Sequence, residues 1–133
     1  MKVSIIVGGR FHAFNLAEEL ERKKALHQLI TSYPKFYLKN KFKINQSKIK
    51  SFFLKEIISR SLSKIDFLNK KFNLDNFTIN YFDRQASQNV NYSNLDVLVG
   101  WSSFSLRSFK KATKFNCIKV LERGSSHIEY QYE

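Results

Sequence analysis

Short apolar runs alternate with amphipathic stretches along most of this chain. A continuous apolar run is typical of a strand buried on both faces, as in a parallel sheet, whereas apolar residues at helical spacing predict a helix with one buried side. The predicted strands are Val3–Val7, His27–Thr31, Leu95–Trp101 and Asn116–Leu121, and the predicted helices are Phe14–Lys24 and Phe104–Lys114. This order predicts an α/β fold, a Rossmann-like parallel sheet with helices on both faces, in which the first strand–helix–strand unit has a right-handed crossover.

The middle of the chain has a less regular pattern. Asn76–Phe82 is weakly strand-like, and Asp83–Val90 predicts a short helix that its first residue caps. Within Lys35–Phe72, apolar residues recur at helical spacing from Ile49 onward, which predicts one or two helices.

Length and composition predict one domain over residues 1–133. The chain is 43% hydrophobic, enough to form a real core, and its only cysteine, Cys117, excludes an internal disulfide. No apolar run approaches the ~20 residues that a membrane-spanning helix needs. Val3–Val7 is too short for a signal-peptide core. We therefore expect a cytoplasmic protein, peripheral at the inner face of the membrane.

The net charge of +12 points to an anionic partner. Most of the excess lies in Lys35–Phe72, which holds eleven basic residues and two acidic ones. Three interpretations stay open: a core stripe with a solvated basic face, a membrane-surface patch, or phosphate contacts to nucleic acid. Because the segment shows no known nucleic-acid-binding module, nucleic acid is the least favoured partner. The candidate membrane patch is Lys41, Lys43, Lys48, Lys50 and Lys55.

Three polar loops follow the predicted strands: Gly8–His12, Gly100–Ser103 and Glu122–His127. Carboxyl ends of parallel strands share one edge, where open α/β sheets bind ligands. Backbone N–H groups, hydroxyls and basic side chains suit phosphate and sugar hydroxyls. The alternative is that Gly8 and Gly9 only form a turn between two core elements. The candidate residues are Gly8, Gly9, Arg10, His12, Gly100, Trp101, Ser102, Arg123, Ser125, Ser126 and His127.

Other site types lack the required spacing. The chain has no Gly-x-Ser-x-Gly nucleophile elbow, its histidines and carboxylates lack metal-ligand spacing, and the glycines do not complete the dinucleotide-binding fingerprint. We therefore expect neither a metal nor a cofactor. We interpret His27, at the start of a predicted strand, as a structural residue.

The same residues carry a family resemblance. Several segments of the chain resemble the N-terminal domain of family 4 glycosyltransferases of the GT-B fold. They are the first strand with its Gly-Gly-Arg-Phe-His loop, Asn15–Leu20, Phe82-Asp83, Asp96–Trp101 and, above all, Leu121–His127. The resemblance covers nearly the whole chain and is weakest over residues 36–80.

The resemblance implies a metal-independent retaining transferase that takes a nucleotide sugar as donor substrate. It implies that Gly8 and Gly9 approach the donor diphosphate and that His127, as the catalytic residue, faces the transferred sugar. It further implies that this domain holds the acceptor, often a lipid-linked or polysaccharide intermediate at a membrane. A basic patch between Lys35 and Lys71 fits that placement.

One large departure separates the chain from that family. The second, donor-binding domain with its paired glutamates is not in this sequence, so the resemblance implies half of an enzyme whose partner is the missing C-terminal domain. We expect no transferase activity from the chain alone. Two rivals remain: a basic binding module for anionic membrane or nucleic acid, and a small nucleotide-binding protein that acts by itself.

Overall fold

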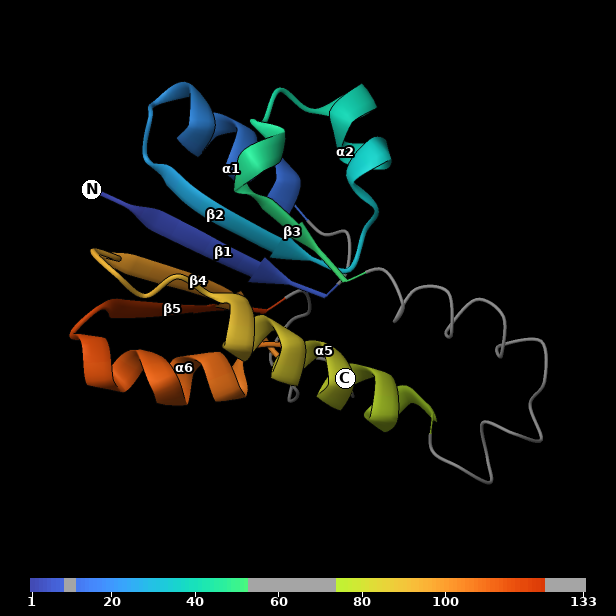
Figure 1. The fold of residues 1–133 in the computed structure, drawn as a ribbon, viewed down its shortest axis with the longest axis vertical. Helices are drawn as coiled ribbons and strands as arrows, with labels where there is room; N and C mark the ends of the chain where they lie inside the picture. The colour runs from blue at the N-terminus through green and yellow to red at the C-terminus, as the bar shows by residue number, and fades with distance from the viewer. Residues whose placement is uncertain (9–11, 53–73, 124–133) are drawn as a thin grey trace, which may run out of the picture.

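The computed structural model describes residues 1–8, 12–52 and 74–123. Five parallel strands form one sheet in the order β3-β2-β1-β4-β5 (Figure 1). The strands are β1 (Val3–Val7), β2 (Leu26–Thr31), β3 (Ile49–Ser51), β4 (Val97–Trp101) and β5 (Ile118–Glu122). The α/β, Rossmann-like prediction is therefore confirmed.

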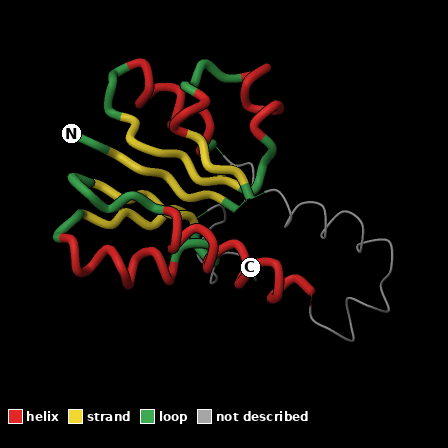
Figure 2. The backbone as a smooth tube through the Cα atoms, viewed as in Figure 1, coloured by secondary structure: helices red, strands yellow, loops and turns green. Residues whose placement is uncertain are grey.

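Helices cover both faces of the sheet (Figure 2). They are α1 (Ala13–Arg22), α2 (Lys35–Lys41), α5 (Leu74–Asn89) and α6 (Leu106–Ala112), with short 3-10 turns η1 (Gln46–Lys48) and η2 (Thr113–Phe115). On one face, Ile5 of β1 packs in a cluster with Phe14 of α1 and Leu38 of α2. On the other, Ile6 packs with Phe82 of α5. Successive residues of a strand point to opposite faces, so a continuously apolar β1 supplies both clusters.

The residues predicted as a strand over Asn76–Phe82 belong to helix α5 instead, and that prediction was wrong. Thr78, Phe82 and Ala86 are buried at intervals of four residues, which is helical spacing against the sheet. Asp83, predicted to cap a short helix, lies inside α5. The local Phe77-Thr78-Ile79 run favours a strand, but packing of the longer amphipathic face overrides it.

The helical pattern predicted from Ile49 onward also begins differently. Ile49–Ser51 forms strand β3, where buried Ile49 pairs with Leu29 of β2. The rest of that predicted pattern, residues 53–72, lies outside the described residues. Helix α2 starts directly after Pro34, whose φ of −63° suits a residue at the entry to a helix.

Candidate functional site

The strand order places a topological switch point at β1. The chain builds the sheet outward from β1 to β2 and β3 on one side, and then to β4 and β5 on the other. In open α/β sheets the crevice for a ligand opens at such a point, outside the carboxyl ends of the strands. Ile6 pairs with Gly100, so β1 and β4 end side by side at this edge.

Gly8 is buried at this edge between Ser32, which follows β2, and Phe104, in the turn after β4. Its carbonyl accepts a hydrogen bond from Ser32 Oγ at 2.8 Å. A methyl group at Gly8 would lie 2.2 Å from Cδ1 of Phe104, so the ring of Phe104 packs directly against the glycine backbone. This close packing fixes the position at which the chain leaves β1. The role of Gly8 toward a donor diphosphate stays a prediction.

His12 and Trp101 meet across the same edge. The imidazole of His12, at the N-cap of α1, lies 5.2 Å from the Trp101 ring in an edge-to-face arrangement. Trp101 ends β4 and is 1% exposed, whereas His12 is exposed. A buried indole thus supports an exposed group that can donate and accept hydrogen bonds. The structure brings together these two predicted residues.

The turn after β4 presents hydroxyl groups at the switch point. Ser102 donates its N–H to the Glu122 carbonyl at 2.9 Å, which joins this turn to the end of β5. Ser105 Oγ donates to the Trp101 carbonyl at 3.0 Å. Ser103 has φ of 76°, in the left-handed region that L-residues rarely adopt. The turn therefore holds a strained backbone next to the His12–Trp101 pair.

Gly100 is required by packing within the same turn. A Cβ there would lie 2.4 Å from Ser105 Oγ and 2.9 Å from Phe109 Cε1. The space that a side chain at Gly100 would occupy is filled by Ser105 and Phe109. Gly100 thus has a structural reason of its own, and contact of Gly100 with a sugar stays a prediction.

The remaining candidates of the predicted site are divided between described and undescribed residues. Arg123 is exposed directly after β5. Gly9, Arg10, Ser125, Ser126 and His127 lie outside the described residues, so their predicted roles remain predictions.

The predicted membrane patch is spread over several elements. Lys41 on α2 lies 4.6 Å above the ring of Tyr37, and Lys48 on η1 pairs with Glu21 of α1 at 2.6 Å. Lys43 and Lys50 are exposed, and Lys55 lies outside the described residues. In the part of the chain that the structure describes, no helix is long and apolar enough to span a bilayer. Binding of this patch to a membrane surface stays a prediction.

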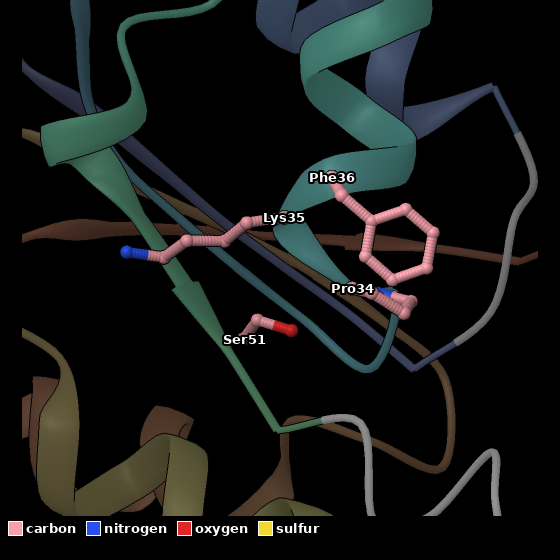
Figure 3. A pocket seen from close by; sticks show the side chains of 4 residues that line it. All are labelled: Pro34, Lys35, Phe36 and Ser51. Atoms are coloured by element: carbon pink, nitrogen blue, oxygen red, sulfur yellow. The ribbon is translucent and has the colours of Figure 1, made fainter.

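A cavity of about 400 Å³ lies at the carboxyl ends of β2 and β3. It is lined by Pro34, Lys35 and Phe36 at the entry to α2 and by Ser51 at the end of β3. Figure 3 shows the Phe36 ring beside Pro34, with the Lys35 side chain extending over β3. Sequence reasoning missed this cavity. The signal was the Tyr33-Pro34 turn, which follows a strand and therefore lies at the ligand-binding edge.

A second cavity, of about 290 Å³, lies between α5 and α6. Its lining residues are Phe77, Asn80, Tyr81, Arg84 and Arg107. Sequence reasoning also missed this group, because residues 76–82 were assigned to a strand, which would place Phe77 and Tyr81 far from Arg84. Among residues 1–8, 12–52 and 74–123, no three His, Cys, Asp or Glu side chains cluster as metal ligands.

Comparison with known proteins leaves the family unassigned. No protein-family model matches the chain, and no curated protein or solved structure is significantly similar to it.

Proposed function

We propose that this chain is the acceptor-side domain of a GT-B glycosyltransferase, part of an enzyme that moves a sugar from a nucleotide donor to an acceptor such as a lipid-linked or polysaccharide intermediate. The observation that carries the proposal is that β1 and β4 end side by side at the switch point, where exposed His12 packs on Trp101. The resemblance of the β1, β4 and β5 loop sequences to family 4 supports it.

Each described group at this edge has a role in the proposal. Gly8 lets the Phe104 ring pack against the end of β1 and so fixes where the chain leaves the sheet beside the proposed diphosphate site. His12 and Ser102 supply hydrogen-bond donors and acceptors for phosphate oxygens or sugar hydroxyls. Arg123 supplies positive charge at the end of β5. A second α/β domain completes the cleft, so the 133-residue chain alone turns over no nucleotide sugar.

The single tryptophan makes the site directly observable, because all indole emission of the chain comes from Trp101. Titration with UDP and with GDP is expected to change that emission saturably for at least one of the two, with weak affinity because only half of a cleft is present. Ser102→Ala is expected to weaken binding, since it removes a hydroxyl at the switch point.

Ser93→Ala is the matched control. Ser93 is exposed in the loop before β4, at the opposite edge of the sheet, so its removal should leave the titration unchanged. Emission that stays constant with both nucleotides, or that responds equally in Ser102→Ala and wild type, would refute nucleotide binding at this edge. Turnover of a nucleotide sugar by the isolated chain would refute the half-enzyme assignment.

A further inference from the structure

The cavity between α5 and α6 is here called the arginine groove, and its lining residues are Phe77, Asn80, Tyr81, Arg84 and Arg107. Four of these residues are spaced i, i+3, i+4 and i+7 along α5 and therefore share one helix face. The other face, with Thr78, Phe82 and Ala86, is buried toward the sheet. Among the described residues, the groove side of α5 therefore faces the cavity and not the sheet.

Asp83 fixes the geometry of the groove. Its carboxylate, 6% exposed, accepts the backbone N–H of Arg107 at 3.2 Å and its guanidinium at 3.3 Å. The same guanidinium lies 3.4 Å from the Asn80 carbonyl. These bonds hold the start of α6 beside the middle of α5. Arg107 is thereby positioned before any ligand arrives, which reduces the entropy lost on binding.

The groove has uncompensated positive charge. The Arg107 side chain remains 45% exposed although it pairs with Asp83. Arg84 is exposed, and within the described residues no carboxylate pairs with it. Two guanidinium groups therefore line one cavity with a single carboxylate beneath them. Guanidinium groups bind phosphate through paired, charge-assisted hydrogen bonds, so the favoured ligand group is a phosphate.

Aromatic surface lies beside the two arginines. Phe77 is 57% exposed, and Tyr81 is half-buried on the same face of α5. An exposed aromatic ring next to arginine side chains is the arrangement on which bases stack. Asn80 adds an amide that can donate to or accept from a base edge. The cavity volume of about 290 Å³ suits one nucleotide unit.

We propose that the arginine groove binds a nucleotide unit, with its phosphate on Arg84 and Arg107 and its base against Phe77 and Tyr81. The shared chemistry is a phosphate next to a planar base, and its source is either a free mononucleotide or a single-stranded nucleic acid. This site is lined by α5 and α6 and shares no lining residue with the His12–Trp101 pair, and the proposal does not depend on the proposed transferase function.

The test is an NMR titration of the ¹⁵N-labelled chain with UMP, with inorganic phosphate and with a ten-nucleotide oligothymidine. We expect UMP to shift the backbone amides of Phe77, Arg84 and Arg107, with inorganic phosphate binding at least fivefold more weakly. If the oligonucleotide binds tenfold more tightly than UMP and weakens with salt, the source is a single strand. Equal affinity for UMP and for the oligonucleotide identifies a free nucleotide as the source.

Two exposed positions provide variants that leave the fold intact. Arg84→Gln and Phe77→Ala are each expected to weaken UMP binding at least fivefold. Lys23→Gln, which removes an exposed charge on the opposite face of the sheet, is the control and should retain wild-type affinity.

Three outcomes would overturn the proposal: unchanged affinity in both groove variants, inorganic phosphate binding as tightly as UMP, or shifts confined to residues outside the groove. Shifts confined to Gly8, His12 and Trp101 would overturn the groove while supporting the switch-point site, so the two proposals fail separately.

Discussion

At the scale of single residues, close contacts determine which substitutions the candidate site can accept. Gly8 and Gly100 both lie where a Cβ would meet atoms of the turn after β4 or the start of α6. Neither position has a positive φ, so what requires glycine is space. The same packing fixes the ends of β1 and β4 next to His12 and Ser102, which makes the glycines important to the site whether or not they contact a ligand.

Gly8→Ala should destabilise the chain because the new methyl group overlaps the ring of Phe104. Overpacking of this kind costs about 1–3 kcal/mol in the free energy of unfolding, measured by urea denaturation. In a Phe104→Ala background the ring is absent, so the same glycine substitution should cost clearly less. Equal costs in the two backgrounds would show that the ring is not what excludes a side chain.

Tyr92 provides a second residue-scale prediction. Burial raises the pKa of Tyr92 to about 12, above its ordinary value of 10.0. The folded state therefore holds this proton more tightly than the unfolded state, and the stability that results is present below pH 10 and lost as pH rises through 12. Ultraviolet absorbance titration should show a tyrosine step near pH 12 that Tyr92→Phe removes. A variant that still shows this step would contradict the assignment.

At the scale of elements, one carboxylate joins α5 to α6. Asp83 is buried beneath the arginine groove and bonds to Arg107 across 24 positions of sequence. Burial raises the pKa of the Asp83 carboxyl above 3.8, opposed by the hydrogen bonds and charge of Arg107. The pairing therefore positions α6 while the buried charge opposes folding.

The sign of the Asp83 effect on stability follows from its raised pKa. The folded state binds the Asp83 proton more tightly than the unfolded state does. The stability that results is therefore full below pH 3.8 and is lost as pH rises through the pKa of Asp83 in the folded state. Asp83→Asn removes this titration. We expect the free energy of unfolding of wild type, relative to Asp83→Asn, to fall as pH is raised through this acid range in urea experiments. A constant or rising difference would contradict the burial effect.

The parts of the fold that the sequence pattern predicted are those with a dense local signal. The apolar runs of β1 and β4 need both faces covered, so an α/β sheet follows from them directly. Helix α5 was missed because Phe77-Thr78-Ile79 resembles a strand when it is read without Phe82 and Ala86. The arginine groove depends on the contact between Asp83 and Arg107, and no local pattern shows a contact between residues so far apart.

At the scale of the whole molecule, the sheet order brings together the groups of the proposed switch-point site. Because the strands diverge from β1 in both directions, Gly8, His12, Trp101 and Ser102 gather at one edge although they come from two distant segments. The arginine groove lies on one face of the same sheet. We therefore propose two separate regions: a switch-point edge for a sugar-nucleotide reaction, and the arginine groove for a nucleotide unit.

The most direct test of the central claim is a crystal structure of the chain with UDP. The account predicts the diphosphate at the carboxyl edge between β1 and β4, next to Gly8 and within hydrogen-bond distance of Ser102 or His12. A diphosphate bound away from this edge, with the switch point holding only water, would contradict it.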